Sequence, residues 1–273
     1  MHILTFDIEQ WWCNFIPTDN LDLSYSVKKR TEEILSLLEA RNITPTFFIV
    51  GEFAKQHPDL VRRIAQKYDI GSHGMTHNLV SQQSYKEFAD DVLTSLHVLE
   101  DITGKKVTKY RAPGFSIPNN EYLKVLFDTP VETDCSLSAQ NHFYGKKMLE
   151  SDSIICLEHN GRRIKEFPPS VIGLAGRDLG FLGGGYFRFF PYFMIKKWLN
   201  AKQDYSLTYL HPSDFDTNQP RIASYSHFEK FKRYVGLKSS EKKLVRMLKD
   251  FAFCDVAYAQ QQINWHEVPL VKI

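Results

Sequence analysis

Hydrophobic positions in the first half of the chain alternate between short continuous runs and stretches with helical spacing. The short runs predict strands at residues 3–6, 44–50, 70–72, 107–110 and 131–133. The helical spacing predicts helices at residues 26–40, 58–67, 84–102 and 119–127. Strands that alternate with helices pair in parallel through right-handed crossovers, so we predict an α/β fold that closes into a full or partial barrel.

Two of the predicted helices carry sequence signals at their ends. Ser84 followed by Glu87 has the pattern of a capping box, and Gly104 favours the end of the same helix. Pro58 occupies the first turn of its helix, where the missing N–H is tolerated, so the helix is expected to begin there.

The alternation breaks at about residue 139. Residues 139–190 are rich in Gly, Phe and Pro and predict hairpins and loops that form an insertion over one rim. The later predicted elements are a helix at 191–199, a strand at 206–210, and polar helices at 225–236 and 239–251. Because no low-complexity linker interrupts the chain, we predict one domain over residues 1–273.

Composition narrows the classes of function. The 273 residues are 43% hydrophobic and 24% charged, which excludes a disordered chain, a collagen-like repeat and a coiled coil. The formal net charge of +2 argues against a nucleic-acid binder, which carries a basic stripe. The aromatic content of 14% suits a large core together with a groove for flat ligands such as sugar rings.

Cysteine usage and the N-terminus bear on the compartment. The four cysteines are scattered and form no C-x-x-C pair, so they predict free thiols in a reducing compartment. No basic leader precedes the first acid, and no window approaches the roughly 20 apolar residues of a membrane span. With Met1 as the natural start, we expect a cytoplasmic protein.

Two histidines directly follow the strand predicted at residues 70–72. His73 and His77 lie four positions apart, a spacing at which two imidazoles can face the same way and bind one metal ion. The spacing alone is more typical of ordinary polar surface histidines. The position at the carboxyl end of a parallel strand, where α/β folds build their sites, favours the metal interpretation.

Other polar side chains also stand at predicted strand ends. Asp7 and Glu9 share one face of the first strand, so one can complete a metal site while the other acts as a base; solvated acids are the alternative. Arg111 can pair with Asp134 or hold Asp7 in place. His211 is a candidate general acid or a packed histidine.

The motifs D-x-E, H-x-x-x-H, R-A-P-G and L-H-P therefore stand in order at four strand ends. This ordered set resembles the polysaccharide deacetylase family, the NodB homology domain of carbohydrate esterase family 4, over about residues 3–211. Residues 183–188 and the His211-Pro212 pair resemble a subgroup associated with exopolysaccharide loci.

The resemblance implies a distorted (β/α) barrel of the NodB type with a divalent metal, usually zinc. It makes Asp7 the catalytic base, with Glu9, His73 and His77 as metal ligands. Many members carry adjacent aspartates where this chain has Asp-Ile-Glu. The family arginine corresponds to Arg111, which tethers the base.

The resemblance also assigns residues around the substrate. Asp134 corresponds to the aspartate after the fifth strand, and His211 to the general acid. The N–H of Gly114 contributes to the oxyanion site, where Phe115 replaces the aromatic wall that many members have one position earlier. Leu210 corresponds to the apolar wall around the acetyl methyl group.

The implied activity is removal of an N-acetyl group from a sugar in a glycan or lipid-linked precursor, with release of acetate. Two alternatives are hydrolysis of another amide or a cyclic ureide on the same fold, and a catalytically inactive glycan-binding module. The candidates for sugar stacking, each with a core role as the alternative, are Trp11, Trp12, Phe115, Tyr186 and Phe187.

Overall fold

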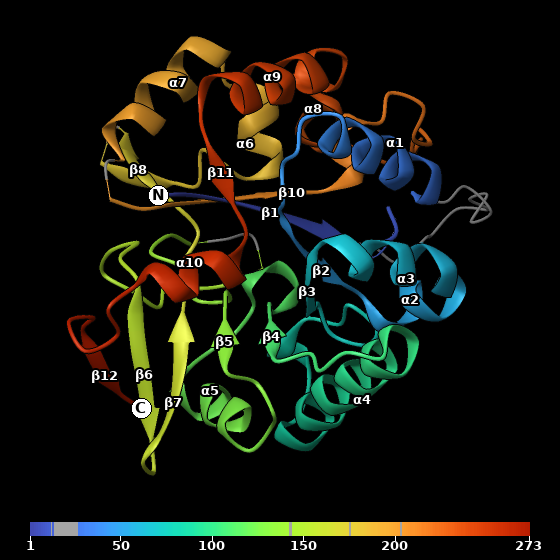
Figure 1. Ribbon diagram of the computed structural model, residues 1–273. Helices are drawn as coiled ribbons and strands as arrows, with labels where there is room; N and C mark the ends of the chain where they lie inside the picture. The colour runs from blue at the N-terminus through green and yellow to red at the C-terminus, as the bar shows by residue number, and fades with distance from the viewer. Residues whose placement is uncertain (12, 14–26, 142–143, 175, 203) are drawn as a thin grey trace.

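A computed structural model describes residues 1–11, 13, 27–141, 144–174, 176–202 and 204–273 (Figure 1). Within these residues a ten-stranded sheet has the order β10-β1-β2-β3-β4-β5-β7-β6-β12, with β11 paired to β1. Its strands are β1 (His2–Ile8), β2 (Thr46–Ile49), β3 (Asp69–Ser72), β4 (Lys109–Tyr110), β5 (Thr133–Asp134), β6 (Ile155–His159), β7 (Arg162–Glu166), β10 (Ser206–Leu210), β11 (Phe253–Cys254) and β12 (Leu270–Lys272). Within this sheet the strand pairs are parallel except β6 with β7, so the predicted α/β class is confirmed.

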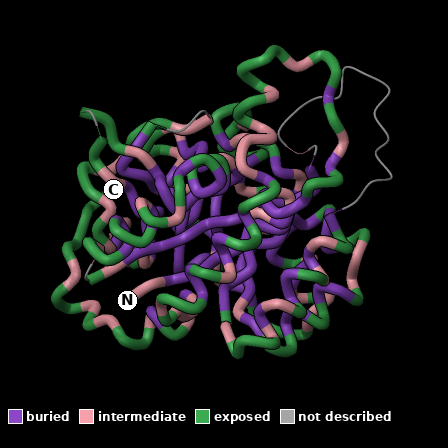
Figure 2. Tube along the Cα trace, turned by 90° about the horizontal axis from the view of Figure 1, so that it is seen from above, coloured by how far each residue is buried: buried purple, intermediate pink, exposed green. Residues whose placement is uncertain are grey.

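The strands lie in the interior, and Figure 1 shows α1, α3, α4 and α7 at the periphery. The helices are α1 (Lys28–Glu39), α2 (Gly51–Gln56), α3 (Pro58–Lys67), α4 (Tyr85–Thr103), α5 (Asn120–Phe127), α6 (Gly184–Phe189), α7 (Tyr192–Ala201), α8 (His227–Tyr234), α9 (Leu237–Asp250) and α10 (Val256–Gln262). Figure 2 shows buried chain in the interior of the molecule and exposed chain mostly around it. Phe6 and Phe47, both fully buried, stack at 5.6 Å between ring centroids in this core.

A row of residues that are paired across neighbouring strands marks the carboxyl edge of the sheet. The row runs across six strands as Ile8, Ile49, Ser72, Tyr110, Asp134 and Glu166. Glu9, His73 and Arg111 each follow a member of this row by one residue. Because the carboxyl ends of parallel strands share one edge, side chains far apart in sequence are brought to the same rim.

Helix ends with local signals form as predicted. α3 spans the predicted residues, and Pro58 stands at its first position. The Ser84–Glu87 capping box is present at the start of α4, and Gly104 ends that helix in the left-handed conformation, at φ 67°. The short helix α2, the helix α10 and the strands β11 and β12 were not predicted.

The predicted insertion contributes to the sheet. The hairpin of β6 and β7 lies beside β5, while β8 (Ile172–Leu174) and β9 (Arg177–Leu179) form a separate pair. The expectation of a loop around residues 183–188 was wrong, because α6 forms there. The glycines at the start of α6 allow other side chains to pack closely against the backbone. A Cβ added at Gly183 would lie 2.0 Å from Tyr209, and a Cβ added at Gly184 would lie 2.7 Å from Asp214.

The cysteines and the hydropathy of the helices agree with two expectations from the sequence. All four cysteines are free thiols. Across the described ranges, we find no helix with the length and apolarity that crossing a bilayer requires.

Candidate functional site

Glu9, His73 and His77 form a buried group at the carboxyl edge of the sheet. Glu9 Oε2 lies 2.5 Å from His77 Nε2 and 3.5 Å from His73 Nε2. The three candidate ligand atoms lie within 4.8 Å of one another. One carboxylate and two imidazoles are a donor set that suits zinc and similar divalent ions. The structure therefore brings the three predicted ligands together.

The orientation of His73 fits a metal ligand. Its Nδ1 lies 2.8 Å from the Arg111 carbonyl oxygen, which only accepts hydrogen bonds, so Nδ1 carries the proton. The lone pair then stands on Nε2, the atom that faces Glu9. A backbone partner on the far nitrogen is the usual way in which proteins fix the tautomer of a metal-binding histidine.

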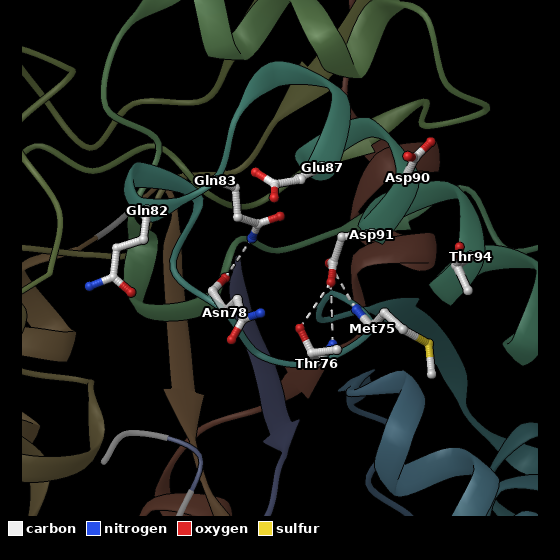
Figure 3. Close-up of a pocket in the computed structure, with 9 residues that line it drawn as sticks. All are labelled: Met75, Thr76, Asn78, Gln82, Gln83, Glu87, Asp90, Asp91 and Thr94. Carbon is white, nitrogen blue, oxygen red and sulfur yellow. Dashed lines mark hydrogen bonds between the residues drawn. The ribbon is translucent and has the colours of Figure 1, made fainter. Parts of the chain in front are cut away.

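Helices α2 and α4 hold the loop that carries both histidines. Asp91 of α4 accepts hydrogen bonds from the Met75 N–H at 2.8 Å and from the N–H and hydroxyl of Thr76 at 3.3 and 3.2 Å (Figure 3). The Gly51 N–H donates to the Gly74 carbonyl at 2.9 Å. Gly74 has φ 75°, and an added Cβ would lie 2.8 Å from Asp91 Oδ2. Sequence reasoning missed Asp91, because a lone acid in a helix carries no signal of the loop it will meet.

Asp7 lies beside this group in a buried ion pair. Its Oδ1 accepts a hydrogen bond from Arg111 Nη1 at 2.6 Å, and the same nitrogen donates to Thr5 Oγ1 at 2.8 Å. Arg111 is fully buried, with its guanidinium 4.2 Å from the centre of the Phe48 ring. A buried, arginine-paired carboxylate is held in one orientation. Its second oxygen, Oδ2, lies 3.8 Å from His211 Nε2.

His211 is oriented by Asp214, three residues further along the chain. Asp214 Oδ2 lies 3.0 Å from His211 Nδ1, and Asp214 Oδ1 lies 2.9 Å from Arg188 Nε. Burial alone would lower the pKa of His211, but the hydrogen bond and negative charge of Asp214 raise it to about 9. The imidazole is therefore positively charged at neutral pH. Sequence reasoning named neither Asp214 nor Arg188 as a site residue.

Asp134 is not the partner of Arg111, contrary to one expectation from the sequence. Its Oδ1 accepts hydrogen bonds from Ser136 Oγ and, at 3.0 Å, from the Cys135 N–H. Asp134 stands opposite Glu166 across β5 and β7, and both carboxyls are fully buried. Burial raises the pKa of Asp134 to about 6, and burial and the negative charge of Asp134 raise that of Glu166 well above its usual value. The pair therefore shares a proton at neutral pH.

The three residues predicted to contact the substrate lie in different surroundings. Gly114 stands in the turn Pro113–Phe115 with φ 60°, one residue after the proline that follows Ala112. Phe115 is buried, and its ring packs 4.8 Å from that of Tyr209. Leu210 is fully buried in the core, because its neighbour Tyr209 takes the other face of β10. The expected role of Leu210 as an apolar wall of the site is therefore wrong.

A groove of about 580 Å³ opens beside the site. Glu9 and His211 line it, as do residues of α6 and α8. Among the stacking candidates, Tyr186 lines the groove and is 41% exposed. Trp11 and Phe187 are buried in the core instead, and Trp12 lies outside the described residues.

The fold and the site define an α/β protein with a one-carboxylate, two-histidine group at the carboxyl edge of a parallel sheet. A family profile described as polysaccharide deacetylase matches residues 2–132, and a profile described as a domain of unknown function (DUF3473) matches residues 135–261. Residues 2–132 therefore belong to the polysaccharide deacetylase family.

Named relatives match part of the chain. A peptidoglycan-N-acetylglucosamine deacetylase of Bacillus cereus is 34% identical over 98 residues, which cover 35% of this chain and 36% of that protein. A chitooligosaccharide deacetylase of Bradyrhizobium sp. is 29% identical over 85 residues, which cover 30% of this chain and 39% of that protein. The matched stretches thus span little more than a third of either relative.

A solved structure extends the likeness to the whole fold. A crystal structure of a protein from Mycobacterium smegmatis, assigned to the polysaccharide deacetylases, has a TM-score of 0.70 and 16% sequence identity. The superposition covers 100% of this chain and 92% of that chain. It shows that the two proteins share a fold.

Proposed function

We propose that the protein is a metal-dependent hydrolase that removes an N-acetyl group from a sugar in a glycan or glycan precursor. The observation that carries the proposal is the convergence of Glu9, His73 and His77 with Asp7 and His211 at one rim. Membership of the polysaccharide deacetylase family supports it, as do relatives named for N-acetylglucosamine and chitooligosaccharide deacetylation.

Glu9, His73 and His77 would hold the metal ion, for which we propose zinc. When bound, such an ion supplies a Lewis acid and lowers the pKa of a water molecule. The resemblance of residues 183–188 to the exopolysaccharide subgroup supports a role in exopolysaccharide synthesis. The four free thiols support a second proposal, that the protein works in the reducing cytoplasm.

Asp7 and His211 each carry out one proton transfer, Asp7 as the base and His211 as the acid. Asp7, fixed by Arg111, takes a proton from the attacking water, whose oxygen bonds to the acetamide carbon. The Gly114 N–H contributes a hydrogen bond to the developing oxyanion. His211, protonated because of Asp214, donates its proton to the sugar nitrogen as the carbon–nitrogen bond breaks. The products are acetate and a free amino sugar.

Acetate release from N-acetylglucosamine oligomers with added zinc tests the proposal. The variant Asp7→Asn is expected to lose at least about a hundredfold in kcat/KM, because it removes the base. Asp128→Asn, which changes an exposed acid, serves as the matched control. A wild-type protein that is inactive on a broad panel of acetylated sugars, or an Asp7→Asn variant that stays active, would count against the proposal.

Metal analysis separates the deacetylase from the inactive binding module. The wild-type protein is expected to hold about one zinc ion per chain, and His77→Ala to lose it. Sugar binding that persists without any metal would favour the binding module. Hydrolysis of other amides or cyclic ureides, with acetylated sugars left intact, would favour the second alternative.

A further inference from the structure

Exposed aromatic rings from two helices gather along the groove beside the site. Phe189 of α6 and Phe228 and Phe231 of α8 are 50%, 68% and 51% exposed, and all three line the groove together with Tyr186. The rings of Phe189 and Phe231 meet at 6.0 Å with an interplanar angle of 74°. Large apolar side chains kept in water beside a candidate active site are typical of a surface that binds a ligand.

The same groove is also lined by hydrogen-bonding groups. Asn141, Ser213 and Gln219 line it, and Lys232 Nζ stands 5.3 Å from the centre of the Phe228 ring. A sugar ring has apolar C–H faces that stack on aromatic rings and hydroxyls around its edge that need polar partners. A hydrocarbon chain has no group that can form hydrogen bonds with these side chains. The mixed lining therefore fits sugars better than a lipid tail.

The backbone at Gly185 leaves room for such a ring. A Cβ added there would meet only Arg188 Nη2, at 3.9 Å, whereas the two preceding glycines are packed against protein atoms. Gly185 and Tyr186 both line the groove, so a flat ligand can approach the main chain next to an exposed ring. The same groove reaches Glu9 and His211, which makes it continuous with the candidate reaction centre.

We propose that the aromatic rings of α6 and α8 form a subsite for sugar units beyond the one that is deacetylated, so that the substrate is a chain of several sugars. This inference rests on the proposed deacetylase function. It assigns the second half of the chain a role in selecting substrates by length, because α6 and α8 both lie within residues 135–261.

The test measures kcat/KM for acetate release from N-acetylglucosamine oligomers of one to five units, with the zinc-loaded protein. We expect kcat/KM to rise at least about tenfold from monomer to tetramer. Phe228→Ala and Phe231→Ala are each expected to lower the tetramer-to-monomer ratio about fivefold, the value of one lost aromatic contact. Phe193→Ala is the matched control, because Phe193 of α7 is 72% exposed and is not a groove residue.

A binding measurement separates the subsite from the catalytic proposal. Calorimetric titration of the tetramer into Asp7→Asn is expected to show a Kd that rises about fivefold when Phe231→Ala is added. If the wild-type protein releases no acetate but tetramer binding still depends on Phe231, the subsite would be retained and the deacetylase proposal rejected. Equal kcat/KM along the oligomer series, equal effects of Phe193→Ala and Phe231→Ala, or no tetramer binding would overturn the subsite.

Discussion

His211 Nδ1 lies 3.0 Å from Asp214 Oδ2, the same oxygen that accepts the His211 backbone N–H at 2.8 Å. The carboxylate also forms an ion pair with Arg188, which donates hydrogen bonds to the carbonyls of Lys232 and Val235. The orientation of the imidazole is thus tied to the last turns of α8 and to Val235, which follows that helix. An acid that must deliver a proton to one atom benefits from such rigid support.

The charge on His211 is expected to depend on Asp214. Asp214→Asn removes the negative charge that favours the imidazolium, so the pKa of His211 should fall from about 9 by about 1–2 units. NMR titration of the metal-free protein measures this directly, and the alkaline limb of kcat/KM should move to lower pH with it. An unchanged His211 titration in Asp214→Asn would rule out this electrostatic account.

Removing the carboxylate of Asp91 is expected to weaken metal binding. Asp91→Ala leaves the Met75 and Thr76 N–H groups without their acceptor, so the histidine loop loses its fixed geometry. Loss of such supporting contacts typically weakens metal binding about 10- to 100-fold. Competition with a chelator measures the affinity, and circular dichroism checks the fold. Asp90→Ala is the matched control. Among the ion pairs of the described residues, Asp90 pairs only with Lys86, on the same helix. Equal effects of the two variants would contradict the prediction.

Gly74 is expected to tolerate substitution less well than Gly104. Both have positive φ, 75° and 67°, but an added Cβ meets Asp91 at 2.8 Å in one case and nothing within 4 Å in the other. Gly104→Ala should therefore lower the free energy of unfolding by only about 1–2 kcal/mol, the cost of placing an alanine in the left-handed conformation. Gly74→Ala should cost at least about 1 kcal/mol more, through displacement of the Asp91 carboxylate. Urea unfolding compares the two, and equal free energies of unfolding would show that the contact is unimportant.

The buried Asp134–Glu166 pair is expected to make stability depend on pH. The pKa of Glu166 is raised in the folded protein, so the folded state holds a proton that the unfolded state releases above about pH 4.5. Stability should therefore fall as the pH rises from 5 to 8. Glu166→Gln keeps a neutral group in place and should reduce this fall. The urea midpoints at pH 5 and pH 8 provide the measurement, and a variant that loses as much stability as the wild type would refute the shared proton.

The parts of the fold that sequence predicts are those governed by neighbours along the chain. Ser84, Glu87 and Gly104 act within one or two turns of α4, so its ends could be located without the tertiary structure. The strand-end positions of Glu9 and His73 follow from the α/β rhythm and from the common edge of parallel strands. These signals predict that the histidines and carboxylates lie at the same edge of the sheet.

The remaining features depend on contacts between distant segments. Gly183 and Gly184 indicate a loop by composition, yet they are required by the side chains of Tyr209 and Asp214, which approach too closely for any Cβ. Asp134 pairs with Glu166 because β7 is the neighbour of β5, and a pattern in the sequence cannot specify that neighbour for a hairpin that returns to the sheet.

The place of β1 between β2 and β10 limits how this protein can change in evolution. Phe6 is level with Leu210 on one side and with Phe47 on the other, so both flanks fix the strand at once. Because the side chains of a strand alternate, gain or loss of a single residue within β1 would exchange Asp7 for a hydrophobic neighbour at the rim. Length variation among descendants of this sequence should accordingly be confined to the connections between elements, and this strand should keep its number of residues.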